Sequence, residues 1–259
     1  MKVLLLDAGN SRVKWALIDA AAPGHRLSTG ACSYTDSGFP GQLYSLWGDL
    51  PRVDKVLLSC VAGSAVITAL SEVAGHCWGV SPDWLETEAE YAGVINGYTD
   101  PQQLGVDRWL AMIGGRRSLV SPASMWVVDC GTAVTIDYVE DNGRHRGGLI
   151  LPGLKMMHDR MTLTTTALKA FNSDTLSLAE TEAGMTMNTL ATDTATAVAR
   201  GIMISLVASL DSITASDDNA VRIITGGDGA VIGPHLKGHW LSRPNLVLEG
   251  MAVYAEEWA

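Results

Sequence analysis

An aspartate with a glycine two residues later ends a strand-like run twice in this chain, once in each half. The first copy is Asp7–Asn10 (Asp-Ala-Gly-Asn), after an apolar run at 3–6, and the second is Asp129–Thr132 (Asp-Cys-Gly-Thr), after a run at 126–128. Glycine lets the backbone approach a phosphate and supplies the positive φ of tight turns, and a carboxylate beside it can hold a cation. One such turn is usually only a hairpin turn. Two at equivalent positions predict a duplicated phosphate site that clamps one nucleotide.

The elements that must position these turns also repeat. Each turn is followed by a second strand-like run that closes on an acid, at Asp19 and at Asp137. In the first half, strands are predicted at Lys2–Leu6, Arg12–Asp19, Ala31–Tyr34, Lys55–Val61 and His76–Val80, and helices at Phe39–Leu50, Ala62–Ala74 and Asp107–Leu119. Tight connections followed by crossovers indicate a mixed sheet, antiparallel at its start and parallel afterwards.

Ser and Pro interrupt the periodicity at Ser118–Ala123, after which the pattern restarts. The second half has predicted strands at Ser124–Asp129, Thr132–Glu140, His145–Leu151, Val221–Thr225 and Leu246–Leu248, and helices at Leu154–Leu168, at Thr192–Ile213, near Ala230 and from Glu249. We therefore predict an α/β chain with a duplicated ribonuclease-H-like (actin-like ATPase) fold. Its two domains, 1–118 and 119–259, are expected to surround a nucleotide cleft.

Composition narrows the class of protein. The 259 residues are 47% hydrophobic and 18% charged, with a formal net charge of -10, which describes a globular chain with a sizeable core. The acidic balance argues against nucleic acid or an anionic membrane surface as the main partner. We expect no signal peptide and no membrane span, and the four separate cysteines favour free thiols. The chain is therefore expected to be cytoplasmic.

A third glycine-rich turn, Thr225–Gly229 (Thr-Gly-Gly-Asp-Gly), ends a predicted strand and opens a helix. Paired glycines allow a base or ribose to lie against the backbone, and a helix N-terminus favours anionic groups. Taken alone, the segment is more typical of an ordinary strand-to-helix turn than of a nucleotide site. Together with the two aspartate turns, it predicts the third wall of an ATP site.

These three turns resemble those of the actin, hexokinase and Hsp70-like ATPase superfamily. Within it, several segments are similar to type III pantothenate kinases, and they occur in the family's order along most of the chain: Asp7–Lys14, Gly105–Arg108, Asp129–Asp137, Gly147–Gly153 and Asp193–Gly201. The resemblance implies ATP as the phosphoryl donor, with Mg²⁺ and a monovalent cation (K⁺ or NH4⁺). It places ATP at Asp7, Ala8, Gly9, Asn10, Ser11, Arg12, Val13, Lys14, Thr132, Gly226 and Gly227. A solvated strand face is an equally good interpretation for Arg12.

The resemblance assigns Asp107 as the catalytic base that accepts the proton of the substrate hydroxyl. An unperturbed carboxylate, with a pKa of about 3.9, is a weak base for an alcohol. Because phosphoryl transfer has a loose transition state, orientation matters more than basicity. The adjacent Arg108 would grip the substrate carboxylate through its planar fork. The alternative is an N-capping Asp beside an ion-paired Arg.

The resemblance also implies the cation sites and the remaining substrate contacts. A monovalent cation is expected at Asp129 and magnesium at Asp7 through water; hairpin-turn aspartates are the alternative. The pantothenate pocket is expected at Tyr98, Gly105, Val106, Asp107, Arg108 and Thr194. Thr194 could instead be an N-cap hydroxyl. The long segment Ser81–Gln103, which carries Tyr98, is expected to border the cleft.

The predicted function is therefore ATP-dependent phosphorylation of pantothenate to 4'-phosphopantothenate, the first step of coenzyme A biosynthesis. The family implies a homodimer, with the apolar helices of the second half as the natural interface. The alternatives are an accessory or regulatory binding protein of the same fold without kinase activity, and a kinase of another small alcohol.

Overall fold

The computed structural model describes residues 1–34, 38–164 and 190–258. The chain divides into two compact units. Unit 1 comprises Met1–Pro122, Asp141–Arg146 and Asn245–Ala259, and unit 2 comprises Ala123–Glu140 and Gly147–Pro244. The ranges expected from the sequence, 1–118 and 119–259, thus differ from these units at one hairpin tip and at the C-terminal helix.

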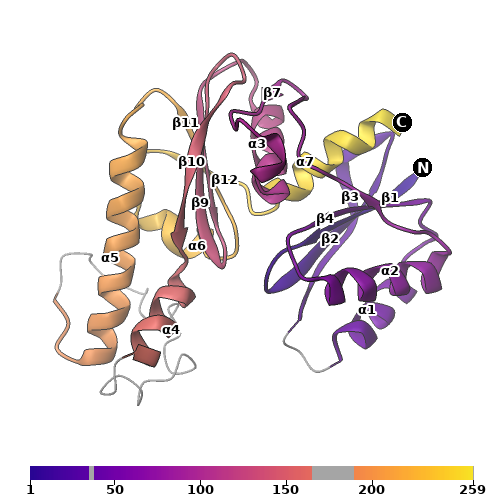
Figure 1. Cartoon of the computed structure of the whole chain (residues 1–259), viewed down its shortest axis with the longest axis horizontal. Helices are drawn as coiled ribbons and strands as arrows, with labels where there is room; N and C mark the ends of the chain where they lie inside the picture. The colour runs from indigo at the N-terminus through magenta and orange to yellow at the C-terminus, as the bar shows by residue number, and fades with distance from the viewer. Residues whose placement is uncertain (35–37, 165–189, 259) are drawn as a thin grey trace. The chain divides into compact units, whose positions relative to one another are not determined.

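Unit 1 is built on a five-stranded mixed sheet (Figure 1). Its strands are β1 (Lys2–Ala8), β2 (Arg12–Asp19), β3 (Ala22–Ser33), β4 (Lys55–Cys60) and β5 (Asp83–Trp84), in the order β3-β2-β1-β4-β5. The first three strands are antiparallel, and β4 and β5 run parallel to β1. The mixed sheet predicted from the short and long connections is confirmed.

Helices cover both faces of this sheet, so Val3 to Leu6 of its central strand β1 are apolar and buried. Leu4 and Leu6 of β1 lie in one core cluster with Leu43 and Trp47 of α1 (Phe39–Gly48) and with Leu70 of α2 (Ser64–Trp78). On the other side, α7 (Leu246–Ala255) packs against β1 and against α3 (Val106–Ser118). Strand β1 carries Asp7 near its end, so the buried residues Val3 to Leu6 fix the position of that turn.

Two predicted strands are wrong, and both are helical. Residues His76–Val80 were expected as a strand, but His76 to Trp78 end α2, in which Leu70, Val73, Ala74, Cys77 and Trp78 pack at helical spacing on the core. Residues Leu246–Leu248 begin α7. A short apolar run fits a buried helix as well as a strand. Helix α7 lies close to α3 because Gly250 has no side chain, since a Cβ there would overlap the carbonyl oxygen of Leu110.

Unit 2 repeats the sheet of unit 1 (Figure 1). Its strands are β8 (Met125–Cys130), β9 (Ala133–Val139), β10 (His145–Pro152), β11 (Val221–Thr225) and β12 (Trp240–Ser242), in the order β10-β9-β8-β11-β12. As in unit 1, the first two strands are antiparallel and the later ones are parallel to the first. The duplicated fold predicted from the repeated pattern is confirmed. Strand β12 was missed because its three residues carry too little pattern.

Among the residues of unit 2 that the structure describes, three α-helices accompany this second sheet: α4 (Leu154–Thr164), α5 (Thr194–Thr214) and α6 (Gly229–Ile232). The predicted helix Leu154–Leu168 is confirmed as far as Thr164, and its last residues lie outside the described part of the chain. Helix α5 is long and apolar enough to cross a membrane by length and composition alone. It packs Ile202, Met203 and Leu206 into the core of unit 2, as the core helix of a globular unit does.

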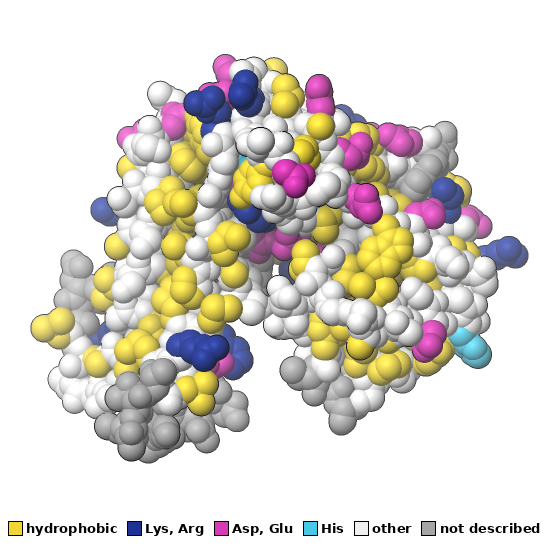
Figure 2. Space-filling view, in the orientation of Figure 1, with side chains coloured by type: hydrophobic (Ala, Val, Ile, Leu, Met, Phe, Trp, Pro, Cys, Tyr) yellow, Lys and Arg dark blue, Asp and Glu magenta, His cyan; other side chains and the backbone are white. Residues whose placement is uncertain are grey.

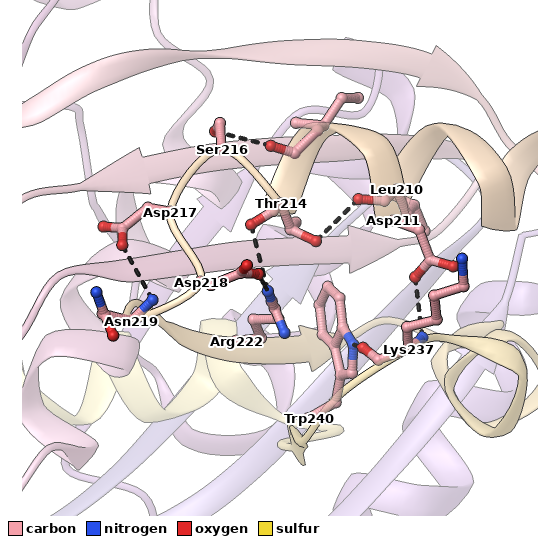
Figure 3. Close-up of polar contacts among 11 residues, drawn as sticks. Leu210, Asp211, Thr214, Ser216, Asp217, Asp218, Asn219, Arg222, Lys237 and Trp240 are labelled. Carbon is pink, nitrogen blue, oxygen red and sulfur yellow. Dashed lines mark hydrogen bonds and ion pairs between the residues drawn. The ribbon is translucent and has the colours of Figure 1, made fainter.

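Polar contacts fix the connection from α5 to β11 (Figure 3). Arg222 of β11 donates to the carbonyl of Thr214 and to Asp218, at 3.4 and 2.6 Å. The backbone N–H of Lys237 donates to Asp211 at 2.9 Å. These contacts surround a cavity of about 710 Å³ at the start of β11, the end of the strand remote from Gly226.

Candidate functional site

The two aspartate turns occupy equivalent places in the two sheets. Asp7 lies opposite Lys14 on β2 and Ser59 on β4. Asp129 lies opposite Thr135 on β9 and Thr225 on β11. Each turn is closed by a backbone hydrogen bond from its glycine, Gly9 to Arg12 in one and Gly131 to Ala133 in the other, both at 3.1 Å. The duplication read from the sequence therefore extends to strand register and turn closure.

The expected backbone conformation of these two glycines is wrong. Neither Gly9 nor Gly131 is among the residues with positive φ, whereas Gly226 has φ +89°. A hydrogen-bonded hairpin can close with ordinary φ values, so glycine at the aspartate turns leaves room for a ligand without being required by the bend. The left-handed conformation is needed at Gly226, where the chain leaves β11.

Two glycines of unit 2 bring neighbouring backbone against the Asp129 turn. A Cβ at Gly226 would overlap the carbonyl oxygen of Cys130 and come within 2.5 Å of Oδ1 of Asp129. A Cβ at Gly153 would overlap the carbonyl oxygens of Gly131 and Thr132. The Gly153 N–H donates to Thr132 at 3.2 Å, and the Asp228 N–H donates to Cys130 at 2.9 Å. The Asp129 turn and the Gly226-Gly227 turn therefore form one continuous backbone surface.

The surface beside Gly227 is open. A Cβ there would meet nothing within 4 Å, and Gly227 itself is exposed. Thr132 is also exposed, whereas the nearby Cys130 is buried. Burial, followed by the charges of Asp129 and Asp228, raises the pKa of the Cys130 thiol. The Cys130 thiol is therefore neutral, and the negative charge at this turn comes from the carboxylates of Asp129 and Asp228.

In unit 1, Asp7 is half-buried, and Lys14 lies directly opposite it on β2. Directly opposed residues of an antiparallel pair share a face of the sheet. Lys14 and Arg12, two residues apart, share that face too, with Arg12 exposed and Lys14 half-buried. Asn10 and Ser11 at the tip are exposed. Cationic and polar groups are thus available on the face that carries the Asp7 carboxylate.

Asp107 lies at the second helical position of α3. The N-cap is Gly105, and the backbone N–H of Arg108 donates to Oδ1 of Asp107 at 2.8 Å. The alternative interpretation of Asp107 as the N-cap is therefore wrong. A carboxylate in the first turn is stabilised by the helix dipole and the unsatisfied N–H groups there. Asp107 is half-buried, so its orientation is fixed while it remains accessible.

Arg108 is buried, with 6% of its surface exposed. Its Nη1 donates to the hydroxyl oxygen of Tyr98 at 3.0 Å, and its guanidinium carbon lies 5.7 Å from the centre of the Tyr98 ring. A buried guanidinium requires hydrogen-bonding partners because an unpaired buried charge is costly. The structure therefore brings Tyr98 together with the start of α3, which carries Gly105, Val106, Asp107 and Arg108.

The segment that carries Tyr98 is held by many hydrogen bonds. It contains the short strands β6 (Glu90–Tyr91) and β7 (Val94–Ile95) and the 3-10 helix η1 (Pro101–Gln103). The hydroxyl of Thr87 donates to Leu104 at 2.8 Å, and Nδ2 of Asn96 donates to Glu88 and Pro101 at 3.2 and 3.4 Å. Tyr98 therefore projects from a fixed segment.

Thr194 is exposed at the first residue of α5. The N-cap is Asp193, whose Oδ1 accepts a hydrogen bond from the backbone N–H of Thr196 at 2.9 Å. The alternative role of Thr194 as the N-cap is therefore wrong. Thr194, Thr132, Asp129 and the Gly226 turn belong to unit 2, whereas the Asp7 turn and the Tyr98–Asp107 group belong to unit 1.

The described residues contain no group of three or more His, Cys, Asp or Glu side chains arranged to hold a metal ion. Magnesium keeps several water ligands and often needs only one or two carboxylates beside substrate phosphates. Asp7, at a turn with room beside its glycine, fits such a magnesium site, and Asp129 offers a carboxylate for a monovalent cation at the equivalent turn of unit 2. Gly153 and Gly226 are packed against backbone carbonyl oxygens, so the open part of this surface is at Gly227, where a Cβ would meet nothing within 4 Å.

The duplicated sheet with these turns defines the actin-like ATPase class of fold. Among solved structures, the chain matches an activator of 2-hydroxyisocaproyl-CoA dehydratase from Clostridium difficile with bound ADPNP, at 13% identity and a TM-score of 0.56 over 100% of this chain and 95% of that one. It also matches a protein from Campylobacter jejuni described as a Baf family transcriptional activator, at 20% identity and a TM-score of 0.60 over 98% of both chains. At these identities the similarity shows the fold alone.

This chain belongs to the type III pantothenate kinase family, whose model matches residues 3–216. A type III pantothenate kinase from Nitrosococcus oceani is 33% identical over 98% of this chain and 94% of its own length. One from Halorhodospira halophila is 36% identical over 99% of this chain and 98% of its own length. The resemblance found in the sequence is thereby confirmed along the whole chain.

Three residues that shape the nucleotide turns or the surroundings of Tyr98 were not predicted from the sequence. Gly153 was read only as part of a family segment, although its place after a strand-ending Pro152 marks a close approach. Asp228 closes the Gly226 turn onto Cys130. His145 carried no local signal, because its partner Tyr98 lies far away in the sequence.

Proposed function

We propose that this member of the type III pantothenate kinase family transfers the γ-phosphoryl group of ATP to the primary hydroxyl of pantothenate, with Asp107 as the base. The observation that carries the proposal is the group at the start of α3. A hydrogen bond from the Arg108 N–H orients the Asp107 carboxylate, and the buried Arg108 is paired with Tyr98. An oriented carboxylate beside a buried guanidinium suits a substrate with both a hydroxyl and a carboxylate.

In this proposal Asp107 accepts the proton of the attacking hydroxyl as the new O–P bond forms and the bond between the γ-phosphorus and the β,γ-bridging oxygen of ATP breaks. The transition state of phosphoryl transfer is loose, so the proton leaves late and a weak base is sufficient if it is well oriented. Arg108 holds the pantothenate carboxylate with two N–H groups, and Tyr98 borders the substrate. Gly105 and Val106 lie beside these groups at the start of α3.

The ATP phosphates are assigned to Asp7–Lys14 and to Thr132. The glycines give access to backbone N–H groups, and Lys14 supplies positive charge on the face of Asp7. The adenosine is assigned to Gly226 and Gly227, where exposed backbone leaves room for a planar group. These assignments place the ATP contacts on turns at strand ends and on Arg12–Lys14 at the start of β2.

Two cations complete the proposal. Magnesium is assigned to Asp7 through water, and K⁺ or NH4⁺ to Asp129. When bound, such cations neutralise charge on the phosphate oxygens and so assist the transfer. In unit 2 the proposal uses the half-buried Asp129 carboxylate, which lies close to the Gly226 turn.

We also propose that the chain is a cytoplasmic homodimer and that Thr194 contributes to the pantothenate pocket. The dimer is supported by apolar side chains exposed on β10, α4 and α5: Leu149, Ile150, Met156, Met161 and Ile204. Figure 2 shows hydrophobic side chains, in yellow, down the face from β10 toward α4. Light scattering of the native chain and of Ile150→Asp tests this part. A dimer that Ile150→Asp converts to a folded monomer is expected, and a native monomer contradicts it.

The reaction is tested by measuring ADP release and product mass with ATP, magnesium and pantothenate, in K⁺ and then in Na⁺. We expect ADP release that requires pantothenate, a product heavier by one phosphoryl group, and lower turnover in Na⁺. Folded protein that binds ATP but releases no pantothenate-dependent ADP would instead favour another alcohol or a regulatory role. Equal turnover in the two salts would refute only the monovalent cation assignment.

A further inference from the structure

The hairpin tip that joins β9 to β10 packs against the segment that carries Tyr98. The backbone N–H of Ile95 donates to the carbonyl of Gly143 at 2.9 Å, and Ile95 forms an isolated parallel bridge with Arg144. These contacts place residues 141–146 in unit 1, although the strands on both sides belong to the sheet of unit 2. A distant part of the chain thus supports the segment beside Tyr98.

His145 lies at the centre of this support. Its side chain is completely buried, and its ring stacks on that of Tyr98 with centroids 5.8 Å apart and planes inclined by 13°. The backbone of His145 also packs against Gly97, since a Cβ at Gly97 would overlap the carbonyl oxygen of His145. His145 therefore fixes both the ring of Tyr98 and the backbone immediately before it.

Tyr98 in turn is bound to Arg108. The Tyr98 hydroxyl accepts from Nη1 of Arg108 at 3.0 Å, so one face of the ring meets His145 while its hydroxyl meets the guanidinium. The backbone N–H of Tyr98 donates to Oδ1 of Asn96 at 3.0 Å, which fixes the start of the side chain. The Tyr98 side chain is thus fixed at its backbone, at its hydroxyl group and along one face of its ring.

We propose that His145 is a positioning residue for pantothenate. Its imidazole ring seats Tyr98, and Tyr98 orients the Arg108 guanidinium that binds the substrate carboxylate. This inference rests on the proposed roles of Tyr98 and Arg108. His145 itself touches no substrate, and its contribution is the planar surface on which Tyr98 rests.

The contacts between His145, Tyr98 and Arg108 predict that the KM for pantothenate changes when His145 is replaced. Loss of the imidazole leaves a space beneath Tyr98, so the ring and the Arg108 guanidinium lose their fixed orientation. The KM for pantothenate in His145→Ala is expected to rise about three- to tenfold, the range that corresponds to one aromatic contact. The KM for ATP is expected to stay within about twofold of the wild-type value, since Tyr98, through which His145 acts, is assigned to pantothenate and not to ATP. His145→Phe keeps a planar ring and is expected to restore most of the loss.

A double-mutant cycle separates positioning from general destabilisation. In the Tyr98→Ala background, His145→Ala is expected to add little further increase in the KM for pantothenate, because the residue through which it acts is gone. His239→Ala, at an exposed histidine, is the matched control and is expected to behave as wild type. Thermal unfolding of every variant identifies those that do not fold, and His145→Phe then carries the test.

Failure of the proposed function and failure of the role of His145 would give different results. A wild-type chain with no pantothenate-dependent turnover would overturn the proposed function itself. An active wild type in which folded His145→Ala has an unchanged KM for pantothenate would overturn only the role of His145. Equal effects of His145→Ala with and without Tyr98, or equal increases in both KM values, would show a general structural role and would also overturn it.

Discussion

The guanidinium of Arg108 and the hydroxyl of Tyr98 form a 3.0 Å hydrogen bond between the start of α3 and a segment ten residues earlier. Arg108 is almost fully buried, so this bond satisfies part of a charge that water cannot reach freely. The bond also links the residue next to Asp107 to an aromatic side chain. In the pantothenate site proposed above, substrate binding is therefore expected to depend on both residues of this pair.

Replacing Arg108 with Lys is expected to raise the KM for pantothenate about tenfold or more, with a smaller change in kcat. Lysine keeps the charge but cannot present two parallel N–H groups to a carboxylate. Steady-state kinetics with varied pantothenate measure the effect. Tyr98→Phe, which removes only the hydroxyl acceptor, is expected to have the same effect in weaker form. An unchanged KM in Arg108→Lys would contradict the carboxylate assignment.

Replacing Gly226 with Ala is expected to weaken ATP binding about tenfold or more, because an overpacked methyl group costs roughly 1–3 kcal/mol and the turn must move to relieve it. The new Cβ would overlap the Cys130 carbonyl oxygen, and the backbone there has φ +89°. Calorimetry with a non-hydrolysable ATP analogue measures the loss.

Gly227→Ala is the matched control for this substitution. A Cβ at Gly227 meets nothing within 4 Å, and its φ is not in the left-handed range. Folding of this variant is expected to be unaffected, so any loss of ATP binding in it reports direct contact of ATP with the added methyl group. Wild-type ATP affinity in Gly226→Ala would contradict the role of this turn.

Asp129→Asn is expected to remove the dependence of turnover on K⁺. The amide is similar in size to the carboxylate but carries no charge to attract a cation. Turnover is measured in matched K⁺ and Na⁺ buffers. We expect the variant to be slow in both salts, whereas wild type is fast only in K⁺. A variant that still responds to K⁺ as wild type does would contradict the site.

The free energy of unfolding is expected to fall as pH rises above about 8.5. The pKa of the Cys130 thiol is raised in the folded chain, chiefly by burial. The unfolded thiol ionises near its ordinary pKa of about 8.5, so above that pH the unfolded state binds fewer protons and is favoured. Burial raises the pKa of Tyr254 as well, which adds a decline above about pH 10.

Urea unfolding at pH 7.5, 9 and 10.5 checks this expectation. Cys130→Ala, which removes the thiol, is expected to reduce the slope of the free energy of unfolding against pH between the first two conditions. A wild-type free energy that is constant or rises with pH over this range would contradict the assignment.

Much of the fold could be predicted because its signals are local. Asp7 and Asp129 each follow an apolar run, and the strand directions followed from connection lengths. The start of α3 was also visible, since Gly105–Arg108 is a contiguous segment. What could not be predicted depends on contacts between distant residues. The short run Leu246–Leu248 becomes helical where it packs on α3, and Gly250 admits the carbonyl of Leu110.

The site residues divide in the same way into those marked by a local segment and those defined by distant contacts. Tyr98 and Arg108 could be named from their segments, but His145 could not, because its role comes from stacking on a residue 47 positions earlier (145 − 98). Gly226 was singled out as part of a glycine pair, yet only the structure shows that Gly226 packs on the Asp129 turn while Gly227 faces open space. Sequence therefore identified the segments, and packing distinguished their members.

The central claim is that Asp107 is the base, and Asp107→Asn tests it most directly. The amide accepts the hydrogen bond from the Arg108 N–H through its oxygen but cannot take up the substrate proton. We expect kcat for pantothenate-dependent ADP release to fall roughly 100-fold or more, the contribution typical of a general base. ATP affinity and thermal stability are expected to remain near wild type. Turnover within about threefold of wild type in this variant would contradict the account.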